Sequence, residues 1–226
     1  MGRDRDDSNA FVILSALPPE AMAAIIGLRL SERGVPRRTP ASSGRVHLTG
    51  MGPLRARRAA SRLASSLPDG VPVVVLGVGG ALATGFQAGD LVVATAFGIA
   101  DADPDGLLQV VRPPAPLDER SQGLAERLQR TLTGRFASTR AAPLLSAGRT
   151  ARGAEREVLG RCGAVICDTE SAWLGRLAER RPFAVVRAVV DTPERELVSL
   201  QTITGGITGL VRLSQAAGVI AQTLGA

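Results

Sequence analysis

The sequence has no lysine, no tyrosine and a single tryptophan, Trp173, so it is poorly supplied for binding single-stranded nucleic acid. Such sites stack bases on aromatic side chains within a basic groove. All 27 basic residues are arginine and the net charge is +6, but the arginines are scattered. Their densest cluster, Arg55–Arg58, falls in an expected helix, where a solvated face or contact with anionic lipid explains it more simply. We therefore expect no nucleic-acid partner.

Cysteine and long apolar runs are equally scarce. Two cysteines, Cys162 and Cys167, cannot form a disulfide framework or a four-ligand zinc site, and a buried thiol suits a reducing cytosol. No apolar run approaches the roughly 20 residues that cross a bilayer. Residues 1–10 are charged and lack the apolar segment of a signal peptide, so we expect a flexible tail. These features predict a cytoplasmic protein with no metal and no cofactor.

What the chain does contain is an alternation of strand-like and helix-like patterns from residue 11 onward. Strands are expected at 10–16, 45–50, 71–77, 91–97, 142–148, 163–169 and 183–191. Helices are expected from Pro18, at 53–67, 117–132, 151–160 and 170–180, and in a final segment ending near 224. Residues 100–116 have the composition of a loop-rich insertion.

This alternation predicts one α/β domain over residues 11–226. Its architecture is a three-layer sandwich around a mixed, largely parallel sheet. The sheet must be mixed because the strands at 73–77 and 91–97 follow one another without a helix between them.

A glycine-rich loop follows the strand at 71–77 and contains Gly77, Gly79 and Gly80. A dinucleotide-binding loop would need Gly or Ala where Leu82 stands, and a long helix afterwards. Here the next residues instead lead to another strand, which argues against a NAD-binding module. The glycines can let the backbone approach a ligand, although a purely structural turn also fits.

Four polar residues follow predicted strands, where open α/β sheets bind ligands. They are Glu20, Ser146, Glu170 and Asp191. Structural roles are the alternative, because residues 168–170 could simply cap a helix and Asp191 could belong to a turn before Thr192 and Pro193.

These segments resemble the purine nucleoside phosphorylase and nucleosidase superfamily, and the resemblance runs over roughly residues 11–224. It rests on the opening AFVILSALPPEA, the small-residue loop before GDLVV, the strand before DTES, and the strand ending at Asp191. The extended pattern DTES…PFAVVRAVVDTPERELV…TITGGITG looks closest to the hopanoid-biosynthesis branch, whose members are thought to cleave adenine from adenosylhopane. A nucleoside phosphorylase-like fold and a homodimer are implied.

The resemblance implies a role for each acidic residue. Asp191 would protonate adenine at N7, helped by apolar surroundings that raise its pKa. Glu170 would accept hydrogen bonds from the ribose hydroxyls, and Glu20 would activate the attacking water. The remaining substrate-binding positions are Thr169, Val78, Gly79, Gly80, Ser146, Ala147 and Gly148, of which the last three would line the base with their backbone.

The chain also departs from the family pattern. Thr169 replaces a methionine that packs on the ribose, and Val190 replaces the serine before the acid. Val78 stands where phosphorylases carry a phosphate-binding serine, and no arginine immediately precedes the loop, although Arg149 or Arg187 could approach. A phosphate dianion needs charge-assisted donors, so water is favoured as the nucleophile.

We therefore expect an enzyme that cleaves the N-glycosidic bond of a purine nucleoside and releases adenine. A phosphate-dependent phosphorylase and a catalytically weakened nucleoside-binding homologue remain the alternatives. The expected partners are a small purine nucleoside, with phosphate or a lipid substrate at the membrane surface as further candidates.

Overall fold

The computed structural model describes residues 11–32, 45–194 and 201–225. The expected tail at residues 1–10 lies outside this part of the chain. Over the described ranges, no helix has the length and the apolar character needed to cross a membrane.

The strands of the described chain form one eight-stranded sheet with the neighbour order β2-β1-β3-β7-β6-β4-β5. β8 lies outside this linear order and pairs with both β3 and β4. Their bounds are β1 Val12–Ser15, β2 Arg45–Leu48, β3 Val73–Ala81, β4 Leu91–Ala102, β5 Leu108–Pro116, β6 Thr139–Ala147, β7 Ile166–Asp168 and β8 Phe183–Asp191.

The sheet is mixed, as expected, because the pairs β3–β7, β4–β5 and β4–β8 are antiparallel. β8 runs parallel to β3 and antiparallel to β4, so the two consecutive strands at 73–81 and 91–102 lie on either side of it. The pairing thereby closes a ring that runs through β3, β7, β6, β4 and β8. β1 and β2 extend the sheet beyond β3, and β5 extends it beyond β4. The pairs β1–β2, β1–β3, β3–β8, β4–β6 and β6–β7 are parallel.

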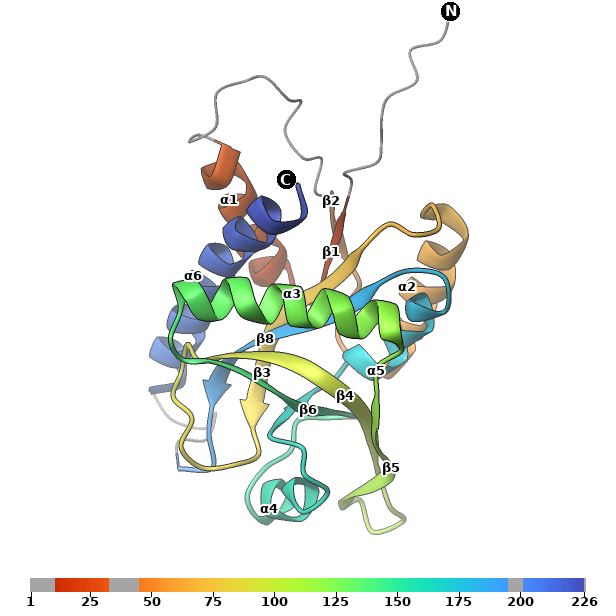
Figure 1. Ribbon diagram of the computed structural model, residues 1–226. Coiled ribbons are helices and arrows are strands. Elements are labelled where there is room, and N and C mark those ends of the chain that lie inside the picture. The colour runs from red at the N-terminus through yellow and green to blue at the C-terminus, as the bar shows by residue number, and fades with distance from the viewer. Residues whose placement is uncertain (1–10, 33–44, 195–200, 226) are drawn as a thin grey trace, which may run out of the picture.

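Helices cover both faces of the sheet, which confirms the three-layer α/β architecture (Figure 1). One face packs against α1, α3 and α6, through buried side chains such as Ala24, Leu128 and Ile220. The other packs against α2 and α5, through side chains such as Ala60 and Leu174. The bounds are α1 Pro18–Glu32, α2 Pro53–Ser66, α3 Glu119–Arg135, α4 Ala154–Gly160, α5 Ser171–Leu174 and α6 Gln201–Leu224.

The prediction of a loop at residues 100–116 is wrong. β4 continues to Ala102, and β5 pairs with it in an antiparallel ladder. The segment is rich in proline, at positions 113, 114 and 116, which is unusual for a strand. β5 is an edge strand, however, so a proline that lacks a backbone N–H need not remove a hydrogen bond of the ladder.

The helix expected at 170–180 is broken into two short pieces. α5 ends at Leu174, and a 3₁₀ helix follows at Gly175–Glu179. The helix expected at 151–160 begins later, at Ala154, because Gly153 has a positive φ of 52° that precedes the first turn. The residues from 148 to 153 are thereby left as a loop beside the sheet.

Candidate active site

A cavity of about 260 Å³ lies where β3, β7 and β8 end. The strand register explains why distant residues meet there. Gly80 of β3 pairs with both Cys167 of β7 and Asp191 of β8, and Asp168 pairs with Ser146 of β6. Seven of the ten predicted site residues line this cavity, namely Glu20, Val78, Gly79, Gly80, Thr169, Glu170 and Asp191.

Ser146, Ala147 and Gly148, which the resemblance assigns to the base, do not line this cavity: Ser146 and Ala147 belong to β6, and Gly148 begins the loop after it. Ser146 and Ala147 are fully buried, and the Ser146 hydroxyl bonds Asp168 at 2.5 Å. Gly148 lies in a neighbouring hollow with Arg149. The cavity wall is formed instead by the next loop residues, Thr150 and Ala151.

Glu20 is folded back against the start of its own helix. One carboxylate oxygen accepts hydrogen bonds from the backbone N–H groups of Ala16 (3.0 Å) and Leu17 (2.8 Å). The other accepts from the N–H of Val78 at 2.8 Å, across the sheet. These contacts fix the carboxylate between the β1–α1 turn and the glycine-rich strand, where only 3% of the residue is exposed.

Helix capping in DTES is carried out by Asp168 and not by Glu170. One oxygen of Asp168 accepts from the backbone N–H groups of Glu170 and Ser171, both at 3.2 Å. The Glu170 side chain makes no capping hydrogen bond. Asp168 therefore has the helix-capping role that was the alternative for residues 168–170. The Glu170 carboxylate lines the cavity and can contact a ligand there.

The Glu170 carboxylate accepts from the backbone N–H of Gly52 at 3.2 Å and from the hydroxyl of Thr169. Its other oxygen lies 3.4 Å from the Arg187 guanidinium. Burial raises the pKa of Glu170, an effect that the charge of Arg187 opposes and that of Asp168 reinforces. The Thr169 hydroxyl thus bonds to this carboxylate.

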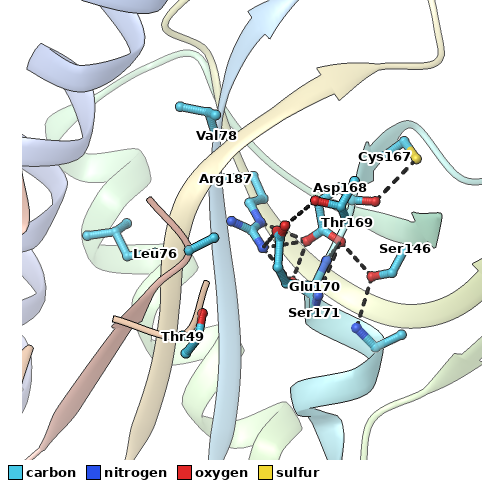
Figure 2. Close-up of polar contacts among 12 residues, drawn as sticks. Thr49, Leu76, Val78, Ser146, Cys167, Asp168, Thr169, Glu170, Ser171 and Arg187 are labelled. Atoms are coloured by element: carbon cyan, nitrogen blue, oxygen red, sulfur yellow. Dashed lines mark hydrogen bonds and ion pairs between the residues drawn. The ribbon is translucent and has the colours of Figure 1, made fainter. Parts of the chain in front are cut away.

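Arg187, from the middle of β8, is fully buried beneath the cavity. Its Nη2 lies 2.6 Å from Asp168 and also donates to Ser171 at 2.9 Å, while Figure 2 shows Asp168 and Glu170 both turned toward it. Burial alone would lower the Arg187 pKa, but the charges of Asp168, Glu170 and Glu20 raise it. Within the described residues, its Nη1 has no hydrogen-bond partner.

Gly77 makes room for this arrangement. A Cβ atom at this position would lie 2.1 Å from Arg187 Nη1 and 2.8 Å from Glu20 Oε1. The free Nη1 and the Glu20 carboxylate therefore face the same bare stretch of β3. Any larger residue at Gly77 would force these two charged groups to move.

The apolar surroundings expected for Asp191 are not found. Its carboxylate forms an ion pair with the guanidinium of Arg156 from α4, and both side chains are nearly inaccessible, at 2% and 3% exposure. Arg156 also donates to the carbonyl of Ala81 at 2.7 Å. Val189 and Val190 precede Asp191 along the strand, but the guanidinium of Arg156 contacts its carboxylate.

Sequence reasoning missed Arg156, Thr150, Ala151 and the segment at Met51–Gly52. Arg156 is one of 27 arginines, and nothing in its local pattern distinguishes it from the solvent-exposed ones. Gly52 precedes Pro53 and was assigned only to the start of a helix. Its N–H contacts Glu170 from 118 positions away, which no local pattern reveals.

Solved structures with this fold cover nearly the whole chain. The 5′-methylthioadenosine/S-adenosylhomocysteine nucleosidase of Neisseria meningitidis, in complex with methylthio-immucillin-A, has a TM-score of 0.68 and 17% identity, over 94% of this chain and 98% of that one. The corresponding nucleosidase of S. pneumoniae reaches 0.70 at 18%, over 95% and 99%. Futalosine hydrolase of Helicobacter pylori reaches 0.67 at 16%, over 95% and 96%. At these identities the likeness establishes the fold.

No curated protein sequence matches the chain. A family model does, and it covers most of the fold, including β1, the glycine-rich strand, DTES and Asp191. The match extends over residues 11–204 and its description is the phosphorylase superfamily. This chain therefore belongs to the phosphorylase superfamily.

Proposed function

We propose that the protein hydrolyses the N-glycosidic bond of an adenine nucleoside and releases adenine. The observation that carries this proposal is the meeting of Glu20, Glu170 and Asp191 around one cavity. Each comes from a different element, and each carboxylate is held by hydrogen bonds or an ion pair. Structural neighbours include nucleosidases that hold adenine nucleoside analogues, which supports the same substrate class.

The acidic character of the cavity suits the charge that this reaction develops. Cleavage of a glycosidic bond gives the sugar oxocarbenium character, which nearby carboxylates stabilise. Glu170 would accept hydrogen bonds from the ribose hydroxyls and face the developing positive charge. Its contacts with Gly52 and Thr169 leave it oriented before substrate arrives, which reduces the cost of reorganisation.

Glu20 lines the cavity and would hold the nucleophilic water. Glu20 Oε1 already accepts one hydrogen bond from Val78, but a carboxylate oxygen has a second lone pair for a water proton. Glu20 then takes a proton as the oxygen attacks the sugar carbon.

Water is favoured over phosphate because the site has few free cationic donors. A phosphate dianion would have to approach Glu20 and Glu170, which are both acidic. Arg187 is already bound to Asp168, and Arg149 pairs with Glu155 at 2.8 Å outside the cavity. Val78 offers no hydroxyl. Phosphate would therefore meet more repulsion than attraction.

The 5′ substituent is proposed from the sequence resemblance to the hopanoid-biosynthesis branch, which points to adenosylhopane. Two apolar side chains at the cavity, Leu17 and Met51, are compatible with a large apolar group, and Met51 is 54% exposed. A lipid substrate would be presented at a membrane surface.

Base release from a panel of 5′-substituted adenosines tests the proposal, with products separated by chromatography in the presence and absence of phosphate. We expect adenine and free sugar, little acceleration by phosphate, and a loss of about 10²–10⁴ in rate for Glu20→Gln, since an amide cannot accept the water proton. Sugar 1-phosphate formed only with phosphate would identify a phosphorylase. Nucleoside binding without base release would identify a binding homologue.

A further inference from the structure

The segment at residues 45–68, which contains β2 and α2, carries charge of one sign only. It has five arginines and no acidic residue. All five side chains are exposed, and within the described part of the chain none of them forms an ion pair. They are Arg45, Arg55, Arg57, Arg58 and Arg62. Because nothing nearby in the segment compensates their charge, this surface attracts anions.

α2 turns one face to solvent along its length. The opposite face is buried through Ala56, Ala59, Ala60 and Leu63. On the exposed face, Leu54, Arg58 and Arg62 follow one another at every fourth position, and Arg55 and Arg57 lie on either side of this row. The helix therefore presents a row of guanidiniums that begins with an exposed leucine.

β2 continues the same basic surface. Desolvation lowers the pKa of His47 on β2, and the charges of Arg45 and Arg62 lower it further. Two arginines from different elements thus act on one imidazole, so the arginines of β2 and α2 form one patch.

Exposed apolar side chains lie where this surface meets the cavity. Leu48, Met51 and Leu54 are 48%, 54% and 71% exposed. Met51 also lines the cavity, and the backbone N–H of the next residue, Gly52, bonds to Glu170. The beginning of α2 therefore joins the cavity to a surface on which apolar groups and arginines adjoin.

We propose that the surface formed by β2 and the exposed face of α2 binds a membrane that carries anionic lipids. Guanidiniums pair with the phosphate and carboxylate groups of such lipids. Leu54 and Met51 would enter the boundary between headgroups and acyl chains, as the apolar residues of interfacial helices do. A binding site for free anions alone would have no use for these exposed apolar side chains.

Two other partners match this surface less well. Single-stranded nucleic acid needs aromatic side chains for stacking, and this chain has no tyrosine and a single tryptophan, Trp173, which is buried. A second copy that met this face across a two-fold axis would bring two sets of unpaired arginines together, because such an interface pairs the same patch on both subunits.

Membrane binding through this surface would bring the cavity close to lipid. The binding itself is inferred independently of the proposed reaction. Its consequence, that a nucleoside anchored by an apolar 5′ group reaches the cavity directly from the membrane, rests on the proposed function.

Co-sedimentation of the full chain with lipid vesicles tests the binding in the absence of any nucleoside. We expect the protein to bind vesicles of phosphatidylcholine with about one third phosphatidylserine, and to bind pure phosphatidylcholine far more weakly, since each arginine near an anionic surface strengthens binding about fivefold. Raising the salt concentration from about 0.1 M to about 1 M should release the protein, because the Debye length falls from about 10 Å to about 3 Å.

Two double variants with the same change in net charge separate this surface from general attraction. Arg58→Gln with Arg62→Gln should weaken binding to the anionic vesicles about 25-fold. Arg130→Gln with Arg135→Gln is the matched control, because these exposed arginines lie on α3, which covers the other face of the sheet. It should bind as the parent does. Neither pair lines the cavity, so base release without vesicles should be unchanged in both variants.

Leu54→Ser tests the apolar contribution. It should weaken binding to the anionic vesicles while the dependence on salt stays that of the parent, because the arginines are retained. Leu107→Ser is the control at an exposed leucine between β4 and β5 and should have no effect.

Several outcomes would overturn the inference. Equal binding to neutral and anionic vesicles would show that the arginines do not contribute, and equal losses in the two double variants would show that only net charge matters. Binding to DNA in place of vesicles, lost in Arg58→Gln with Arg62→Gln, would identify a nucleic-acid surface. A change in that variant's mass by light scattering, with no vesicle binding by the parent, would identify a contact between copies. Vesicle binding by a protein that releases no adenine would support this inference and refute the proposed function.

Discussion

Among the described residues at the cavity, negatively charged side chains outnumber positively charged ones. The carboxylates of Glu20, Asp168, Glu170 and Asp191 surround two buried guanidiniums, those of Arg156 and Arg187. Asp168 and Asp191 each pair closely with one arginine, which leaves the charges of Glu20 and Glu170 least compensated. A cationic sugar transition state between them would complete the balance.

Replacing Asp191 by Asn removes the charge that holds Arg156. We expect base release to fall by about 10²–10⁴. Because the variant breaks the buried ion pair between Asp191 and Arg156, we also expect a loss of roughly 3–5 kcal/mol in the free energy of unfolding, measured by denaturant titration. A double variant with Arg156→Gln should recover stability but not activity. Base release within a few-fold of the parent would show that Asp191 has no part in the reaction.

Glu170→Gln keeps the shape of the side chain but removes its charge. If Glu170 binds the ribose hydroxyls, turnover should fall sharply on ribonucleosides, and the variant should lose less on 2′-deoxy substrates. The measurement is kcat/KM for both substrates with the parent and the variant. Equal losses on both would count against contact between Glu170 and the ribose.

The same variant should change how stability depends on pH. Burial raises the pKa of Glu170 in the folded protein, so the folded state binds this proton more tightly than the unfolded chain does. Its contribution is fully present below the unfolded value of about 4.3 and is lost as pH rises through the folded value. The Tm of Glu170→Gln relative to the parent should therefore increase between pH 4 and pH 8. A difference that does not change with pH would contradict this assignment.

At the scale of secondary structure, α6 packs closely against the end of β8 because Gly205 has no side chain. A Cβ atom on Gly205 would lie 2.5 Å from the carbonyl oxygen of Val190, next to Asp191. The motif TITGGITG therefore contains a close contact between helix and strand.

We expect Gly205→Ala to push α6 away from the end of β8. The cost should be about 1–3 kcal/mol in the free energy of unfolding, the usual range for overpacking, with a reduced rate of base release as Asp191 shifts. Gly206→Ala is the matched control, because a Cβ there meets nothing within 4 Å. It should stabilise the helix by up to about 1 kcal/mol. Equal effects of the two substitutions would rule out the contact.

For the whole molecule, we predict a homodimer. Met22, Ile26 and Leu30 form an exposed apolar stripe at successive fourth positions of α1. Leu48 of β2 and Leu54 of α2 are exposed as well. Exposed apolar surface of this kind marks association sites.

Light scattering should give twice 23.4 kDa, or 46.8 kDa, for the parent. Ile26→Glu should reduce this to the monomer mass, since it buries a charge in the expected interface. Val158→Glu on α4 is the control at a separate exposed apolar residue and should leave the mass unchanged. A parent that is monomeric at micromolar concentration would contradict the prediction.

The sequence by itself determined the fold class and the acidic residues of the site. Apolar runs with the periods of strands and helices establish the α/β layers, because burial of those runs dominates folding. Glu20, Glu170 and Asp191 could be found because each follows a strand, and the ends of neighbouring strands meet at one edge of a sheet. The strand at 108–116 could not be predicted from the sequence, because proline-rich edge strands share their composition with loops.

Only the tertiary structure decided which arginines matter and how the acidic residues divide their roles. Arg156 and Arg187 become distinctive only when α4 and β8 bring them to buried carboxylates far away in the chain. Asp168 and Glu170 look interchangeable as helix caps in the sequence, and hydrogen-bond geometry assigns the cap to Asp168. The physical reason is that electrostatic partners are chosen by distance in space, while sequence patterns report only local backbone preference and burial.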